Sequence, residues 1–137
     1  PDLVPVMAVA MTGASGTSTI TDAQRLRIKE SDRLATVCDF LTILGTNIRQ
    51  TKDGLIIDEN NDSTDPSGPA AHCPAPSLCG GTVSSHNDHR IAMAAAVASC
   101  RADGPVIITG AEAVKKSYPD FFTDFTKLGG KVEILEY

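Results

Sequence analysis

The residues with the clearest chemical potential in this sequence form one charged run, Arg27-Ile28-Lys29-Glu30-Ser31-Asp32-Arg33-Leu34. After this run apolar residues recur at helical spacing until Gly45 ends the pattern. Arg33 is therefore expected in the first turn of a helix, where the helix dipole already supplies partial positive charge. Because a cation is unfavourable at that end, Lys29 and Arg33 together with free backbone N–H groups are typical of an anion-binding site.

Charged or polar residues stand at the start of every predicted helix. The four groups are Asp2; Lys29, Glu30 and Arg33; His89 and Arg90; and Lys115 or Lys116. If related helices point the same way, these groups meet in one region, where several cations repel one another unless an anion neutralises them. Asp2 and Glu30 remain as carboxylates that can move protons. The pattern predicts a site for small, strongly anionic molecules.

The same residues also have structural interpretations, which the sequence leaves open. Asp2 is equally well placed to cap its helix. Ser31 and Asp32 are expected to cap the second helix without a catalytic role, and Asp88 to cap the helix that follows it. Lys29 and Arg33 could instead lie on a solvated helix face. His89, the one histidine at a helix start, could have a structural role.

The order of predicted elements repeats along the chain. Residues 1–58 form a first, partial unit, with helices over 3–11 and 31–44 and strands over 17–21, 47–50 and 55–58. Residues 87–137 form a second unit, with helices over 91–99 and 119–128 and strands over 105–109 and 131–135. Between them, residues 59–86 are rich in Pro, Gly, Ser, Asn and Asp and lack periodicity, which predicts a long solvated or partly disordered insertion.

Helix hydrophobicity indicates how the elements are layered. The helices over 3–11 and 91–99 are apolar on every side, so we expect them to be buried all round. The helices that begin near Ser31 and Pro119 are amphipathic and are expected to cover the outside, the second with Phe121, Phe122, Phe125 and Leu128 on its apolar face. The predicted fold class is α/β, with buried inner helices, outer amphipathic helices and sheets.

Composition narrows the function classes. The chain has 137 residues and a net charge of −5, which argues against general nucleic-acid binding but not against a local cationic pocket. No apolar run reaches membrane-spanning length, and no signal peptide is present, so a cytoplasmic location is expected. The sequence opens on Pro1-Asp2 without Met and enters a helix almost at once, which predicts a piece of a longer protein.

The four cysteines offer little chemistry. Cys38 and Cys100 lie in apolar helical stretches and are expected to be small buried hydrophobic residues. A zinc site from His72, Cys73, Cys79 and His86 is conceivable, but its spacing matches no familiar zinc motif. A Cys73–Cys79 disulfide is the other option, although nothing indicates an oxidising compartment. The prediction is that the protein holds no metal.

Four motifs in order resemble signatures of the 5-enolpyruvylshikimate-3-phosphate synthase (EPSP synthase) family. They are Pro1-Asp2, Lys29-Glu30-Ser31-Asp32-Arg33-Leu34, Asp88-His89-Arg90-Ile91-Ala92-Met93-Ala94 and Lys116-Ser117-Tyr118-Pro119-Asp120-Phe121-Phe122. The resemblance covers nearly everything outside the insertion. It implies an enzyme of two lobes built from repeated βαβαββ units, with helix N-termini facing the cleft, of which this chain is the C-terminal portion.

The resemblance also implies a reaction. The family transfers the enolpyruvyl group of phosphoenolpyruvate to the 5-hydroxyl of shikimate 3-phosphate and releases phosphate, by addition and elimination, without a metal or an organic cofactor. The expected partners are these two substrates and the missing N-terminal part of the same enzyme, and the fragment is expected to be inactive alone. Two alternatives are the related transferase that acts on UDP-N-acetylglucosamine and a non-catalytic α/β module that binds anions.

Site roles carry over residue by residue as implications of the resemblance. Asp2 matches an aspartate that contacts the shikimate hydroxyls and is a candidate base. Glu30 matches a glutamate that shuttles a proton at the phosphoenolpyruvate methylene. Lys29 matches a lysine that contacts the acceptor substrate.

The remaining matches concern the donor substrate. Arg33 and Arg90 match arginines that hold phosphoenolpyruvate, for which the planar guanidinium is suited. Lys116 matches a lysine near its phosphate, and His89 a histidine beside the site that positions other groups.

Overall fold

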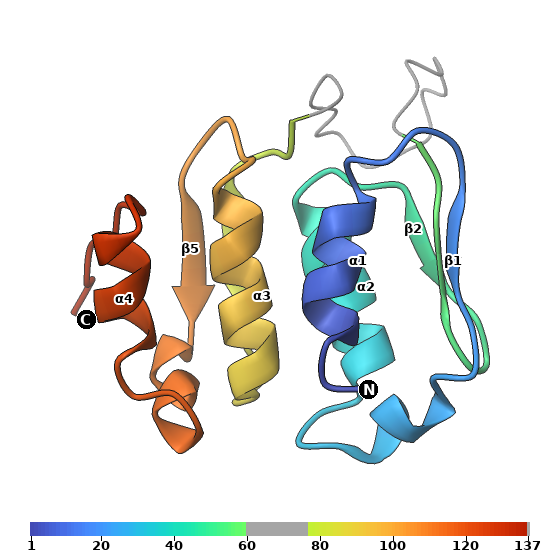
Figure 1. Cartoon of the computed structure of the whole chain (residues 1–137), viewed down its shortest axis with the longest axis horizontal. Helices are drawn as coiled ribbons and strands as arrows, with labels where there is room; N and C mark the ends of the chain where they lie inside the picture. Colours follow the sequence, from blue (N-terminus) through green and yellow to red (C-terminus); the bar gives the residue numbers. More distant parts are fainter. Residues whose placement is uncertain (60–76, 137) are drawn as a thin grey trace.

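The computed structural model describes residues 1–59 and 77–136, and in them the predicted order of elements recurs. The first unit contains α1 (Val4–Met11), β1 (Ser18–Ile20), the 3₁₀ helix η1 (Gln24–Ile28), α2 (Arg33–Ile43), β2 (Ile48–Gln50) and β3 (Leu55–Ile57). The second contains β4 (Gly81–Ser84), α3 (His89–Ser99), β5 (Val106–Thr109), the 3₁₀ helix η2 (Ala111–Lys116) and α4 (Phe121–Lys127). The series α1-β1-η1-α2 thus returns as α3-β5-η2-α4, with two 3₁₀ helices in segments predicted as loops (Figure 1).

Two small sheets flank the helices. In the first unit the strand order is β1-β3-β2, all antiparallel, with Ile20 opposite Leu55 and Ile48 opposite Ile57. In the second unit β4 and β5 pair in parallel, and α3 connects them. Helices and sheets together confirm the α/β class.

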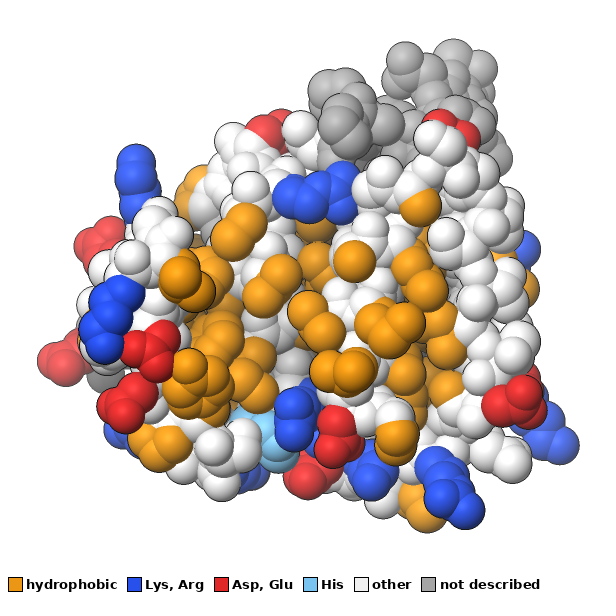
Figure 2. Space-filling model, in the orientation of Figure 1, with side chains coloured by type: hydrophobic (Ala, Val, Ile, Leu, Met, Phe, Trp, Pro, Cys, Tyr) orange, Lys and Arg blue, Asp and Glu red, His pale blue; other side chains and the backbone are white. Residues whose placement is uncertain are grey.

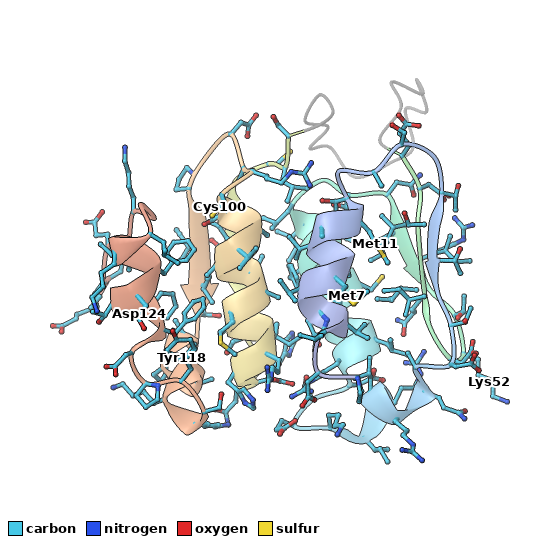
Figure 3. The ribbon with its side chains drawn as sticks, viewed as in Figure 1. Met7, Met11, Lys52, Cys100, Tyr118 and Asp124 are labelled. Carbon is cyan, nitrogen blue, oxygen red and sulfur yellow. The ribbon has the colours of Figure 1, made fainter. Side chains whose placement is uncertain are left out.

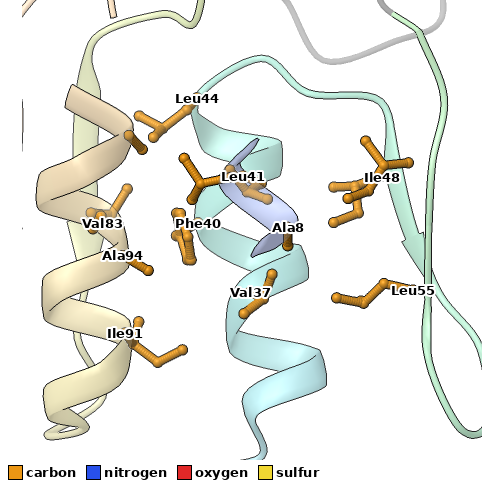
Figure 4. Close-up of a cluster of buried hydrophobic side chains, with 14 of the residues drawn as sticks. Ala8, Val37, Phe40, Leu41, Leu44, Ile48, Leu55, Val83, Ile91 and Ala94 are labelled. Carbon is orange, nitrogen blue, oxygen red and sulfur yellow. The ribbon is translucent and has the colours of Figure 1, made fainter. Parts of the chain in front are cut away.

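The core lies around α2. Leu34, Val37, Phe40 and Leu41 are almost completely buried at the 3/4 spacing that places them on one side of the helix. Figure 4 shows that Phe40 faces α3, whereas the side chains of β2 and β3 approach α2 from the opposite side. The other side of α2 is exposed, so its predicted amphipathic character is confirmed.

The first helix departs from the prediction that it is buried all round. Met7 is 46% exposed and Leu3, just before α1, is 63% exposed. The reason is that α2 and α3 pack against one side of α1, and no other described element covers the opposite side. Figure 3 shows Met7 on this open side, and Figure 2 shows apolar side chains spread over the same face. The hydrophobicity of a helix predicts that it is buried, but it does not show which element covers it.

The segment predicted as an insertion contains a strand. β4 lies within it, and Leu78 and Val83 are buried. The glycine pair Gly80-Gly81 is typical of a loop, but here it serves close packing, because a Cβ atom on Gly80 would lie 2.7 Å from the Pro105 carbonyl oxygen. The prediction for residues 60–76 lies outside the described residues.

The end of the second unit also differs from the prediction. Residues 131–135 form no strand, because no described strand is available to pair with them. α4 begins at Phe121, two residues after the predicted start, and buries none of its residues. Its aromatic side chains pack on one another instead, with the Phe121 ring centroid 5.1 Å from that of Phe122 and 5.9 Å from that of Phe125.

None of the helices within residues 1–59 and 77–136 is long and apolar enough to cross a lipid bilayer.

Truncation of a core leucine tests the central place of α2. Leu41 is fully buried, so Leu41→Ala should lower the free energy of unfolding by about 2–5 kcal/mol, measured by urea denaturation followed by circular dichroism. Leu128 is 90% exposed, and Leu128→Ala should change the same quantity by no more than about 0.5 kcal/mol. Equal losses for the two variants would contradict this description of the core.

Candidate active site

Within the described residues, the α-helices α1 to α4 all begin at the same end of the molecule, the lower end in Figure 1. The predicted site residues therefore gather where α1, α2 and α3 start, and the acidic and basic side chains there form a mixed cluster (Figure 2). This placement follows from the repeat, because two copies of one helix–strand–helix series lie side by side in the same orientation.

Arg33 is the centre of the cluster. It is the first residue of α2 and only 1% exposed. Its guanidinium donates to Asp88 from Nε at 2.8 Å and from Nη2 at 3.2 Å, to Asp2 from Nη1 at 2.9 Å and to Glu30 from Nη2 at 2.7 Å. A cation at a helix N-terminus requires an anion nearby, and here three carboxylates of the chain supply it.

Asp88 is the buried partner of Arg33, with 0% exposure. It caps α3 as predicted, since its Oδ1 accepts from the backbone N–H of Arg90 at 2.9 Å. Its Oδ2 accepts from the Ser31 hydroxyl at 2.8 Å. Burial raises the pKa of Asp88, but the hydrogen bonds from Arg33, Ser31 and Arg90 outweigh it and lower the pKa below the ordinary value. The carboxylate is thus ionised and fixed between the two units.

Asp2 serves the cluster rather than its own helix. Leu3 occupies the N-cap position of α1, without a side-chain cap. The Asp2 carboxylate, 51% exposed, instead bridges Arg33 and Arg90, whose Nη2 lies 3.7 Å from Oδ2. The hydrogen bond from Arg33 lowers the pKa of Asp2, and the charges of Arg90 and Lys29 lower it further despite slight burial. The helix cap that the sequence left open for Asp2 is therefore wrong.

Arg33 is correspondingly held in its charged form. Its burial lowers the guanidinium pKa, but the hydrogen bond and charge of Asp88, the charge of Glu30 and the hydrogen bond to Asp2 outweigh that effect and raise the pKa. Glu30, 45% exposed, approaches Arg33 from the preceding turn. The alternative of a solvated face is therefore wrong for Arg33, because its side chain is buried among carboxylates.

The remaining predicted residues border this cluster. The Lys116 ammonium donates to the backbone carbonyl of Asn87 at 2.5 Å, directly before Asp88. His89 is buried, and its Nδ1 has no hydrogen-bond partner among the described residues. The buried Nε of Arg90 likewise has none there. Lys29 acts on the cluster through its charge on Asp2.

Sequence reasoning missed the tertiary part of the site. Ser31 and Asp32 were both expected to cap α2; Asp32 does so, accepting from the Ala35 N–H at 3.1 Å, whereas the Ser31 hydroxyl donates to Asp88 instead. The ion pair of Asp88 with Arg33 joins residues 55 positions apart, which no local pattern reveals. The one available signal was the gathering of charged residues at both helix starts.

The residues that could hold a metal are few. Residues 1–59 and 77–136 contain no group of three or more His, Cys, Asp or Glu side chains arranged to bind a metal ion. Of the conceivable zinc ligands, His72 and Cys73 lie outside the described residues. Cys79 is buried, and its backbone N–H donates to the Leu44 carbonyl at 2.8 Å.

The repeated α/β unit, with its charged helix starts at one end, has the enolpyruvyl transferase fold. The sequence profile of EPSP synthase (3-phosphoshikimate 1-carboxyvinyltransferase) matches residues 1–125, and the chain belongs to this family. It is 46% identical over 133 residues to the 3-phosphoshikimate 1-carboxyvinyltransferase of Clostridium novyi. The aligned residues make up 97% of this chain and 27% of that protein. The corresponding protein of Methanocella arvoryzae is 43% identical over 134 residues, with 98% and 28% covered.

Solved structures agree with the sequence comparison. An EPSP synthase structure from Acinetobacter baumannii superposes with a TM-score of 0.80 at 35% identity, covering 96% of this chain and 28% of that one. A second structure of EPSP synthase from Acinetobacter baumannii gives a TM-score of 0.77 at 32% identity. The chain therefore spans about a quarter of the length of the relatives that it matches.

The lowered pKa of Asp88 predicts how stability depends on pH. A carboxyl whose pKa is lower in the folded state than its ordinary value of 3.8 stabilises the fold above that value, and this stabilisation is lost as pH falls through the folded-state pKa. The difference in unfolding free energy between the wild type and Asp88→Asn should therefore be constant above about pH 5 and shrink below about pH 4. Urea denaturation from pH 2.5 to 7 measures it. A difference that widens in acid would mean that Asp88 is not the stabilised carboxylate.

Proposed function

We propose that this chain is part of an enzyme that transfers the enolpyruvyl group of phosphoenolpyruvate to the 5-hydroxyl of shikimate 3-phosphate and releases phosphate, a step towards chorismate and the aromatic amino acids. The observation that carries the proposal is the match of residues 1–125 to the EPSP synthase profile, because this stretch includes every residue of the candidate site. The mixed cluster at the helix starts supports it, since both substrates are strongly anionic.

Substrate binding by the cluster requires an exchange of partners. Asp2 and Glu30 are each about half exposed, whereas Asp88 is fully buried. A substrate carboxylate or phosphate can therefore replace the two exposed carboxylates at the guanidinium of Arg33 while Asp88 stays in place. We assign the binding of phosphoenolpyruvate to Arg33 and Arg90, with Lys116 towards its phosphate and His89 as a positioning group.

The carboxylates then supply the proton transfers. We assign Asp2 to the acceptor hydroxyls, as the base that takes the 5-hydroxyl proton, with Lys29 towards the acceptor phosphate. We assign Glu30 to the proton that joins the phosphoenolpyruvate methylene during addition and leaves again when phosphate is eliminated. Both carboxylates accept hydrogen bonds from Arg33. A substrate anion that takes their place at the guanidinium leaves Asp2 and Glu30 free to transfer protons.

The rest of the polypeptide is the first partner of this chain. Relatives are about four times as long, and the exposed apolar side of α1 is suited to packing against further units of the same fold. The cluster lies at the surface of this chain, and we infer that the missing lobe closes over it and completes the site. Because its substrates are multiply charged and do not cross bilayers unaided, we place the reaction in the cytoplasm.

Complementation tests the proposed reaction. The chain is joined to the remaining three quarters of the Clostridium novyi enzyme, and phosphate release is followed with phosphoenolpyruvate and shikimate 3-phosphate. The chimera should turn over, and the isolated chain should not. Release of phosphate with UDP-N-acetylglucosamine but not with shikimate 3-phosphate would overturn the acceptor, and no release with either would overturn the reaction.

Replacing the proposed proton carrier separates chemistry from binding. In the chimera Glu30→Gln should lower kcat by about 10²–10⁴-fold and change the KM for phosphoenolpyruvate only a few-fold, because the amide keeps the shape but cannot carry the proton. Glu133→Gln, an exposed change in the C-terminal segment, is the matched control and should leave both constants unchanged. Equal losses in kcat and in affinity would assign Glu30 to binding.

A further inference from the structure

We propose that Asp88 is a positioning residue of this reaction, which fixes the guanidinium of Arg33 and the first turn of α3 relative to each other; this inference rests on the function proposed above. Asp88 was expected only to cap a helix. Its contacts extend to residues of α2 and of the segment before it. It acts through these groups and makes no contact with substrate, because its carboxylate is fully buried.

The contacts of the carboxylate leave it no freedom. Each oxygen accepts two hydrogen bonds: Oδ2 from Arg33 Nε and Ser31 Oγ, and Oδ1 from Arg33 Nη2 and the Arg90 N–H. Four well-placed donors use the acceptor capacity of an ionised carboxylate almost completely. Neither rotation nor exchange with a ligand is possible without breaking several of these bonds in a buried site.

The geometry divides the guanidinium of Arg33 into two parts. The edge formed by Nε and Nη2 is bound by Asp88 in a forked arrangement, which sets the plane of the group. The rest of the group, Nη1 and the second hydrogen of Nη2, faces the exposed carboxylates Asp2 and Glu30. Asp88 therefore orients the part of Arg33 that an anionic substrate is proposed to use.

The same carboxylate also links the second cation to the first. Because Oδ1 accepts from the backbone N–H of Arg90, the start of α3 is fixed to the guanidinium that begins α2. Arg33 and Arg90 meet different oxygens of Asp2, Oδ1 at 2.9 Å and Oδ2 at 3.7 Å. Loss of Asp88 would let these two cations move independently, and small displacements of positioning groups reduce catalysis strongly.

The test uses the active chimera and the variant Asp88→Asn. Asparagine keeps the size of the side chain and still caps a helix, but it cannot accept a fork from Arg33 and the Arg90 N–H as an anion does. We expect kcat/KM for phosphoenolpyruvate to fall about 10²-fold, with a higher KM for phosphoenolpyruvate and a KM for shikimate 3-phosphate within threefold of wild type. A purely structural role would lower the folded fraction without separating the two KM values.

Asp32→Asn is the matched control, because the Asp32 carboxylate caps α2 and pairs with Arg27 rather than with the guanidinium of Arg33. It should leave both KM values and kcat within threefold of wild type. Should Asp88→Asn fail to fold, Ser31→Ala removes one donor from Asp88 and should raise the KM for phosphoenolpyruvate alone, by about three- to tenfold.

The outcomes separate this inference from the proposed function. The positioning role is overturned if the wild-type chimera releases phosphate and Asp88→Asn has wild-type kinetic constants. It is overturned equally if the two KM values change by the same factor. Where Asp88→Asn does not fold, the same criteria apply to Ser31→Ala. A wild-type chimera that releases no phosphate would instead overturn the proposed function and this inference with it.

Discussion

The buried ion pair between Arg33 and Asp88 is the interaction on which the rest of the site depends. An unpaired guanidinium at the start of α2 would be opposed both by burial and by the helix dipole, so this helix start is stable only with an anion in contact. The anion comes from the start of α3, in the other repeat unit, at 2.8 Å. The Asp88 carboxylate thus neutralises a buried charge, caps α3 and links the two units beside the apolar core that they share.

This constraint explains why functional groups from distant parts of the chain meet. The parallel arrangement of four helices brings their starts to one end of the molecule, and the ion pair then fixes two of them side by side. Around that rigid centre, Asp2 and Glu30 remain about half exposed and able to change partners. A buried, fully bonded carboxylate beside two exposed ones suits the proposed function, in which the site binds an anion and the exposed carboxylates transfer protons.

The sequence predicts the local features of this molecule well and the tertiary ones poorly. Apolar periodicity located α2, the apolar run 91–99 located α3, and the aspartate before His89 marked a cap, since these signals depend on neighbours in sequence. The pairing of Arg33 with Asp88 could not be predicted, because partner choice over 55 residues depends on how the units pack. β4 was not predicted, because a glycine such as Gly80 indicates either a loop or close backbone packing, and the sequence does not distinguish the two. The predictions of full burial for α1 and of a strand over 131–135 were wrong. An apolar helix or a strand-like segment does not show in its own sequence which element packs against it or pairs with it.

A double-mutant cycle tests most directly whether this ion pair organises the structure. The free energy of unfolding is measured at pH 7 for the wild type, Arg33→Gln, Asp88→Asn and the double variant. Breaking one side leaves a buried charge without its partner, so each single change should be strongly destabilising and the double change little worse than either. The account predicts a coupling free energy of about 2–3 kcal/mol between the two positions. Additive losses, within about 0.5 kcal/mol, would show that Arg33 and Asp88 act independently and would contradict it.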